Sequence, residues 1–236
     1  MEKSVCLKCE NLRIGYKNPG IAHNISFSIN QGDYLCIVGE NGSGKSTLVK
    51  TILSIIKPLE GDILWGKGCG KKSLGYLPQQ TDAQKEFPAT VKEIVLSGCL
   101  GQIGLFPFYR KEQKKLALEN MKRLGIEQFA NKPFRELSGG QQQRVLLARA
   151  ICAVKNILIM DEPVAGLDPK VTQELYSFVK ELNKSGITII QITHDLSCLN
   201  DASHILVMKQ QPEFFTKEQY FLSGNFSEAK MEVTNG

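Results

Sequence analysis

The chain has 236 residues, of which 42% are hydrophobic and 22% are charged, values that are ordinary for folded globular proteins and exclude an intrinsically disordered chain. Its formal net charge of +5 comes from Lys and Arg residues spread along the sequence, with only a mild cluster over 110–115, so we expect no nucleic-acid partner. No apolar run is long enough for a membrane-spanning helix or for a secretory signal, so neither is expected.

The seven cysteines do not form the pattern of a disulfide framework. Their number is odd and they are scattered through apolar segments, so we expect reduced, mostly buried thiols. Cys6 and Cys9 have C-x-x-C spacing, but no second pair follows, and in a strand their side chains would point to opposite faces. A metal or redox role for that pair is therefore the less favoured interpretation.

The first predicted elements are a strand, a loop and a helix. Residues 34–38 are a short apolar run, residues 39–44 form a Gly-rich turn, and residues 46–56 have helical spacing. Because Pro58 disfavours helical geometry in the residue before it, the helix is expected to stop by Lys57. Two short apolar runs follow that we predict to be strands, at 63–65 and 74–77.

From about residue 80 to residue 154 the pattern turns helical. Thr90 and Glu93 form a capping-box signature ahead of an apolar stretch. The segment 110–124 repeats apolar residues on one face, and Gly125 suits its C-terminal cap. A helical subdomain is therefore predicted between the strands.

The second half of the chain alternates strand and helix, as a covered parallel sheet requires. A strand is predicted at 156–160, followed by a helix that Asp168 and Pro169 begin and Gly186 ends. Two further strands are predicted at β-branched runs, 187–192 and 205–208.

The pattern G-x-x-x-x-G-K-[ST] occurs at residues 39–46, between a predicted strand and a predicted helix. Glycines suit such a loop because the backbone wraps closely around phosphate oxygens with its N–H groups inward. Lys45 is expected to reach the β- and γ-phosphates of a nucleotide, and the Ser46 hydroxyl to bind Mg²⁺. The alternative, a Gly-rich turn that only caps a helix, does not account for the matching context on both sides. The nucleotide-binding residues expected here are Gly39, Glu40, Asn41, Gly42, Ser43, Gly44, Lys45, Ser46 and Thr47.

An apolar run ends in two carboxylates, Asp161 and Glu162. In a parallel sheet these side chains emerge at the carboxyl edge, where ligands bind. Asp161 is expected to hold Mg²⁺, directly or through water, and Glu162 to orient and polarise the water that attacks the γ-phosphate. An isolated acidic pair after a strand is more often a turn or a helix cap.

The segment Leu137–Gln141 precedes a long predicted helix. Ser138 and Gln141 read as a capping box. A helix N-terminus that carries Ser138, Gly139 and Gly140 is also an anion site, and it lies in the helical subdomain rather than in the phosphate loop. It could serve a phosphate that another subunit presents.

With these motifs in place, the chain resembles the ATP-binding subunits of ATP-binding cassette (ABC) transporters over residues 5–208. The resemblance implies that Tyr16 stacks on the adenine of ATP and that residues 137–141 are the family's signature sequence. It also implies that Gln79 senses Mg²⁺ and the membrane partner, although Gln80 stands beside it.

Two further residues take roles from the resemblance. Asp168 would close the loop after Glu162, and His194 would contact the γ-phosphate. Without the other motifs, Tyr16 and His194 would look like ordinary strand-end residues. The catalytic residues expected are Glu162, His194 and Gln79, and the Mg²⁺ ligands expected are Ser46, Gln79 and Asp161.

The resemblance also implies the fold class. It is an α/β phosphate-loop NTPase of the ABC ATPase type, with a mixed-sheet core, an inserted helical subdomain and an N-terminal antiparallel β region. The whole chain would be one ABC ATPase domain, in which 1–79 and 155–210 form the core. Residues 80–154 would be the helical subdomain and residues 211–236 a C-terminal tail that departs from the family's usual ending.

Partners follow from the same resemblance. Because the chain has one phosphate loop and one signature, a head-to-tail homodimer would complete two sites, with ATP between Lys45 of one copy and Ser138 of the other. An integral membrane permease and an extracytoplasmic substrate-binding protein are also expected. The subunit would then be peripheral, at the cytoplasmic face of the cell membrane.

Three segments resemble the zinc and manganese importer branch of the family: 87–98, Gly104–Phe106 and 165–168. An importer of another substrate is the alternative. A cassette ATPase that acts on nucleic acid or ribosomes fits less well, since it usually needs a second cassette or a long coiled-coil insertion. A non-hydrolysing regulator should lack the acid after Asp161, whereas Glu162 is present.

Overall fold

The structure, a computed structural model, describes residues 4–16, 21–70, 73–79, 87–103 and 108–223. The chain divides into two compact units, one formed by residues 1–71 with 180–236 and the other by residues 72–179. Each unit has its own sheet strands and its own buried side chains.

The first unit contains a three-stranded antiparallel sheet, which confirms the predicted N-terminal β region. β1 (Val5–Ile14) is the central strand, between β2 (Ala22–Asn30) and β4 (Glu60–Trp65). A register shift between Val5 and Leu7 breaks the alternation of faces, so that Cys6 and Leu7 are both buried.

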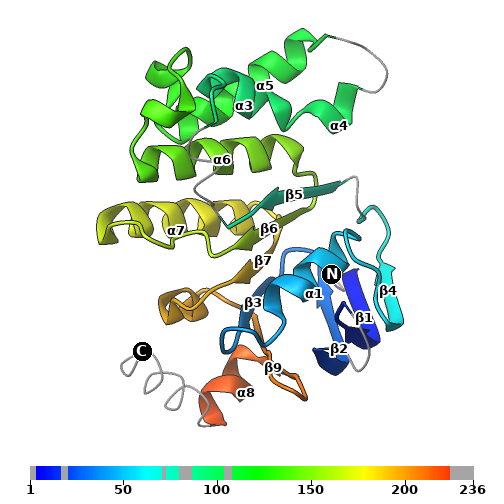
Figure 1. The fold of residues 1–236 in the computed structure, drawn as a ribbon. Coiled ribbons are helices and arrows are strands. Elements are labelled where there is room, and N and C mark those ends of the chain that lie inside the picture. Colours follow the sequence, from blue (N-terminus) through cyan, green and yellow to red (C-terminus); the bar gives the residue numbers. More distant parts are fainter. Residues whose placement is uncertain (1–3, 17–20, 71–72, 80–86, 104–107, 224–236) are drawn as a thin grey trace. The chain divides into compact units, whose positions relative to one another are not determined.

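The same unit contains four strands of a mixed sheet (Figure 1). β3 (Tyr34–Val38) lies between β7 (Thr188–Ile192) and β8 (His204–Val207), all parallel. β9 (Glu213–Thr216) pairs antiparallel with β8. Every residue of β3 and β7 is buried, as expected for inner strands covered on both faces.

The helix that follows β3 is shorter than predicted. α1 runs over Lys45–Ile52, because Ser54 takes the left-handed conformation with φ 58°. Its N–H donates to the Thr51 carbonyl, and the next N–H, of Ile55, donates to the Lys50 carbonyl. This is the Schellman arrangement that ends helices, here with serine at the position usually held by glycine.

The C-terminal segment packs on the first unit as far as it is described. β9 is followed at once by α8 (Lys217–Leu222). The Phe214 ring stacks on His204 at 5.1 Å between centroids and on Phe27 at 5.7 Å. Tyr220 on α8 is fully buried. The Tyr220 side chain therefore belongs to the first unit's core, and Phe214 packs at its edge.

The second unit combines two parallel strands with helices. β5 (Leu74–Leu77) pairs with β6 (Ile157–Asp161). The helices are α3 (Val91–Ser97), α4 (Leu100–Ile103), α5 (Lys111–Arg123), α6 (Gly139–Ala153) and most of α7 (Pro169–Lys184), whose residues from Lys180 onward belong to the first unit. Two 3-10 turns lie at Glu127–Phe129 and Phe134–Glu136.

α6 is the helix on which this unit is organised. It packs against α3, α5 and β5. A Cβ at Gly75 on β5 would lie 2.3 Å from the Ala150 carbonyl oxygen, so only glycine allows the strand to come this close to α6. The predicted capping box of Thr90 and Glu93 is present at the start of α3, and Gly125 has φ 64° after α5.

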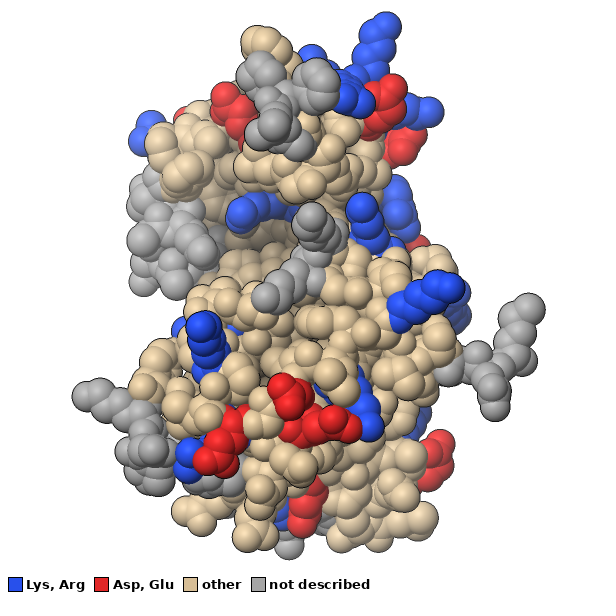
Figure 2. All heavy atoms as spheres, turned by 90° about the vertical axis from the view of Figure 1, so that its right-hand side faces the viewer, with Lys and Arg blue, Asp and Glu red and all other residues tan. Residues whose placement is uncertain are grey.

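Among the described helices, none combines the length and the apolar composition needed to cross a bilayer. In Figure 2, Lys and Arg side chains are dispersed over the face shown, with acidic side chains among them. Two ion pairs lie on the antiparallel sheet, one between Lys8 and Glu10 and the other between Arg13 and Glu60. Positive and negative side chains are therefore mixed on that face.

Candidate functional site

The loop over residues 39–44 follows β3 and is built on glycines with positive φ. These values are 143° at Gly39, 84° at Gly42 and 96° at Gly44, a region that side chains disfavour. A Cβ at Gly39 would also lie 2.3 Å from the Met208 carbonyl oxygen. The loop is therefore held tightly against the end of β8, and its glycines are required by geometry.

Lys45 folds back over this loop. Its Nζ donates to the carbonyl oxygens of Gly39 at 2.6 Å and of Glu40 at 2.8 Å. α1 begins here without a side-chain cap at Gly44, and the Ser43 Oγ is buried without a hydrogen-bond partner. A charged ammonium, a helix N-terminus and an unsatisfied hydroxyl converge on one loop, which fits the oxygens of a phosphate.

Tyr16 lies in a connection whose two ends touch the same loop. The Ile21 N–H donates to the Ile14 carbonyl at 2.7 Å, and a Cβ at Gly44 would meet Ile21 at 3.1 Å and Ile14 at 3.6 Å. The Tyr16 side chain is 64% exposed. An exposed ring beside a phosphate loop is suited to stack on a base, so the assignment of Tyr16 stays a prediction with this geometry in its support.

His194 is positioned by the end of β7. The Thr193 N–H donates to the Ile37 carbonyl at 3.3 Å, and the Asp195 N–H donates to the Thr193 Oγ1 at 2.9 Å. Partial burial, and then the positive charge of Lys45, lower the pKa of His194 below its ordinary value of 6.5. The imidazole of His194 and the ammonium of Lys45 therefore lie close enough within the first unit for their charges to interact. With its pKa lowered, the imidazole is neutral at pH 7.

This coupling gives a titration that can be measured. The His194 ring is expected to titrate below pH 6.5 in the nucleotide-free protein, because protonation would add a second positive charge beside Lys45. Lys45→Met should raise the midpoint without restoring it fully, since burial remains. NMR detection of the ring protons, assigned with His194→Gln, measures both values. An unchanged midpoint in Lys45→Met would show that the two groups do not interact.

The second unit holds the acidic pair at the end of β6. Asp161 is buried. The burial of Tyr76 on β5, together with the negative charge of Asp161, raises the pKa of Tyr76 to about 12. The next residue, Glu162, has φ 49°. Such a conformation costs about 1–3 kcal/mol for a non-glycine residue and recurs at functional positions. Gln143 on α6 steadies this turn by donating to the Pro163 carbonyl at 2.6 Å.

Gln79 lies close to the acidic pair along the strand register. Leu77 on β5 is paired with Met160 on β6, and Gln79 and Glu162 each come two residues later. Both side chains thus follow neighbouring parallel strands at the carboxyl edge. Gln79 is exposed, and its role stays a prediction.

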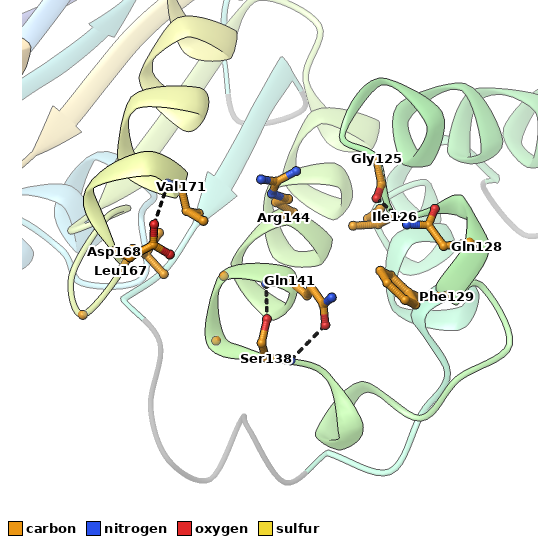
Figure 3. A pocket seen from close by; sticks show the side chains of 13 residues that line it. Gly125, Ile126, Gln128, Phe129, Ser138, Gln141, Arg144, Leu167, Asp168 and Val171 are labelled. Atoms are coloured by element: carbon orange, nitrogen blue, oxygen red, sulfur yellow. Dashed lines mark hydrogen bonds between the residues drawn. The ribbon is translucent and has the colours of Figure 1, made fainter.

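The start of α6 forms one wall of a pocket of about 570 Å³ (Figure 3). The predicted capping box is present: the Gln141 N–H donates to the Ser138 Oγ at 3.4 Å, and the Ser138 N–H donates to the Gln141 Oε1 at 3.0 Å. Ser138 to Gln141 line the pocket from α6, while Asp168 lines it from the start of α7. Residues predicted from two separate motifs therefore share one cavity.

Asp168 also shapes the turn between β6 and α7. Its Oδ1 accepts hydrogen bonds from the backbone N–H groups of Lys170 and Val171, both at 3.1 Å. This is the predicted N-cap. The side chain therefore fixes the loop that leads from Glu162, whatever further role it has.

Several lining residues of this pocket were not predicted. Arg144 is paired with Glu174 on α7 and donates to the Leu124 carbonyl at 3.3 Å. Gly125 and Ile126, from the link after α5, and Gln128 and Phe129, from the 3-10 turn that follows, also line it. The position of Arg144, one turn after Ser138–Gln141 on the same helix, was a signal for it. The Gly104–Phe106 segment that resembled the metal importers lies outside the described residues.

Residues 22–165 match the family model described as ABC transporter. The chain is 35% identical over 198 residues to the manganese transport system ATP-binding protein MntB of Bacillus subtilis, covering 83% of this chain and 79% of that protein. It is 35% identical over 213 residues to the zinc uptake system ATP-binding protein ZurA of Listeria innocua, covering 87% and 83%. The structure of MJ0796, a dimeric ATP-binding cassette bound to ADP and Pi, superposes with a TM-score of 0.74 at 28% identity, covering 89% and 98%.

Proposed function

The chain belongs to the ABC transporter family and is an ATPase that binds ATP, and from this premise we propose that it energises uptake of manganese or zinc through a separate membrane permease. The observation that carries the metal assignment is its 35% identity, over more than four-fifths of the chain, to the Bacillus and Listeria subunits named for manganese and zinc. The resemblance of residues 87–98 and 165–168 to that branch supports the same substrate class.

The first unit would bind the nucleotide. Lys45 and the N–H groups of residues 39–47 would hold the phosphates, and Tyr16 would stack on the adenine. Lys45 is already aimed across the loop by its bonds to Gly39 and Glu40, which a γ-phosphate oxygen would replace. Neutral His194 would then donate a hydrogen bond to the γ-phosphate.

The second unit would supply the chemistry. Glu162 would accept a proton from, and orient, the water that attacks the γ-phosphorus, with Gln79 beside it. Glu162 has a left-handed backbone conformation directly after β6, a kind of local strain that recurs at functional positions. Hydrolysis then consists of positioning and of stabilising the charge that spreads over the γ-phosphate oxygens.

The oxygen donors of the Ser46 hydroxyl, the Asp161 carboxylate and the Gln79 amide are hard ligands of the kind that Mg²⁺ prefers. These three side chains would hold Mg²⁺ together with phosphate oxygens, and the ion would supply positive charge to the leaving and transferred groups. Among the described residues, no group of three or more His, Cys, Asp or Glu side chains is arranged to hold a metal ion. We therefore propose no site for the transported metal on this chain.

A homodimer would complete the site. The pocket lined by Ser138–Gln141 and Asp168 presents a helix N-terminus to solvent, and this arrangement would receive the γ-phosphate of ATP bound to the partner copy. The dimeric MJ0796 structure supports a pairing of this kind. The working complex would also contain permease subunits and an extracytoplasmic substrate-binding protein, and the subunit would then lie at the cytoplasmic face of the membrane.

Co-purification from native membranes, followed by reconstitution with the recovered permease, tests this function. We expect a multi-span permease, and an ATPase rate that rises when manganese or zinc is supplied with its binding protein. Magnesium and calcium salts at the same concentration are the control for a general cation effect. Recovery of a permease that responds to another solute would overturn the metal assignment and keep the motor, whereas a ribosomal or nucleic-acid partner would overturn transport itself.

A further inference from the structure

The cysteines of this chain are arranged in close pairs. All seven lie in described residues, and none of them is in a disulfide bond. The Sγ atoms of Cys6 and Cys69 are 2.9 Å apart, although the two residues are 63 positions apart in the sequence. Two further pairs are in contact, Cys36 with Cys198 and Cys99 with Cys152. Cys6 is thus partnered by Cys69 rather than by Cys9.

Backbone contacts hold the Cys6–Cys69 pair in register. Cys69 lies in the turn after β4, where its N–H donates to the Gly66 carbonyl at 3.0 Å, and the Gly66 N–H donates to the Cys6 carbonyl at 3.0 Å. A Cβ at Gly66 would lie 1.6 Å from the Val5 carbonyl oxygen, so the turn rests directly on β1. A disulfide bond is about 2.05 Å long, which leaves the sulfur atoms only about 0.9 Å of approach to complete.

The two thiols of this pair differ in access to solvent. Cys69 is partly exposed, while Cys6 is fully buried, as are all four cysteines of the other two pairs. Burial, reinforced by the hydrogen bond with Cys69, raises the pKa of Cys6 to about 12. An oxidant from solvent therefore reaches Cys69 first. Cys6 is shielded from solvent and is in contact with Cys69 as a second thiol.

We propose that Cys6 and Cys69 form a modification site that hydroperoxides convert to a reversible disulfide. The Cys69 sulfur attacks a peroxide oxygen, breaks the O–O bond and becomes a sulfenic acid, and the peroxide leaves as water or an alcohol. The Cys6 sulfur then attacks the Cys69 sulfur and displaces its hydroxyl as water, with the two thiol protons accounted for in the products. The peroxide is reduced by two electrons and the thiol pair is oxidised by two.

The disulfide would tie the end of β4 to the start of β1. It closes a loop across 63 residues that contains the phosphate loop. Cys69 also lies two residues before the boundary at residue 71, where the chain passes from the first unit into the second. Loop closure of this length should raise the thermal midpoint by roughly 5 °C or more, and a thiol reductant should return it.

To test this, the 236-residue chain is exposed to equimolar hydrogen peroxide, alkylated with N-ethylmaleimide and digested, and the peptides are identified by mass spectrometry. We expect a Cys6–Cys69 linked peptide that dithiothreitol abolishes, together with the rise in thermal midpoint. Cys69→Ser should remove both effects. Cys9→Ala is the matched control, because Cys9 is another buried cysteine of β1, and it should leave both unchanged.

Two results would overturn the proposal. In one, Cys69 is recovered as an unmodified thiol or as sulfinic acid, and Cys6 can still be alkylated after denaturation. This would contradict the proposal, because a second thiol in contact should react with the sulfenic acid before further oxidation. The other is a disulfide between Cys69 of two different molecules, which a non-reducing gel distinguishes from the internal bond. Neither readout depends on transport or on ATP turnover.

Discussion

Glu162→Gln is expected to lower the rate of ATP hydrolysis by a factor of about 100 or more and to leave ATP binding intact. The amide has the shape of the carboxylate but cannot accept the proton of the attacking water, and such proton transfers contribute about 10²–10⁴ in rate. The binding groups of residues 39–47 belong to the first unit and are untouched. Because ATP would persist in the completed site, the variant should accumulate as a closed dimer.

Single-turnover hydrolysis, equilibrium nucleotide binding and size-exclusion chromatography with ATP measure these three properties. Glu181→Gln is a suitable control, because Glu181 is an exposed carboxylate on α7 away from the turn after β6. It should behave as the wild type does. Wild-type turnover in Glu162→Gln would mean that another group activates the water, and the assignment of Glu162 would be wrong.

Ser138→Arg is expected to abolish ATP-dependent dimerisation while the monomer still binds nucleotide. The larger side chain would fill the pocket shared with Asp168 and remove the hydroxyl that would meet the partner's γ-phosphate. Loss of one or two charge-assisted hydrogen bonds corresponds to about 10- to 100-fold in affinity, and the steric conflict adds to this. If the proposed homodimer is the hydrolysing species, the rate of ATP hydrolysis should fall in parallel.

Thr216→Arg is a matched control for the loss of a helix cap. Thr216 caps α8 with the same reciprocal bonds, its Oγ1 accepting from the Gln219 N–H at 3.3 Å. It lies in the first unit, whereas the Ser138 pocket lies wholly in the second. Both variants should lose a similar, small amount of stability, but only Ser138→Arg should fail to dimerise. Normal dimerisation of Ser138→Arg would remove the signature segment from the proposed interface.

Features that depend on a few neighbouring residues were predictable from the sequence. The capping boxes at Thr90 and Ser138 formed as expected, since each is a contact between residues three apart. The strands before the phosphate loop and before Asp161 were also recognised, because a buried parallel strand is a continuous apolar run. The division of the chain at residues 80, 154 and 210 stays a prediction.

Features made by distant residues were not predictable in the same way. α1 ends where it does because Ser54 adopts a left-handed backbone conformation. A serine in the sequence does not indicate this conformation, which glycine usually adopts. The wall that Phe129 adds to the Ser138 pocket depends on how α5 and α6 pack. The Cys6–Cys69 contact joins residues 63 apart through a turn whose fit requires Gly66. The C-x-x-C spacing of Cys6 and Cys9 gave no indication of this contact.

The hairpin that β8 and β9 form decides what the sheet of the first unit offers to other chains. Without Glu213–Thr216, the edge of β8 would present a row of unpaired N–H and C=O groups. Such an edge can pair with a strand of another chain and promote aggregation. β9 takes that outer place, but it is only four residues long, begins with Glu213 paired to Lys209, and passes directly into α8. Short, charged edges of this kind resist edge-to-edge growth. β9 therefore occupies the edge of β8 at which a strand of another chain could otherwise add.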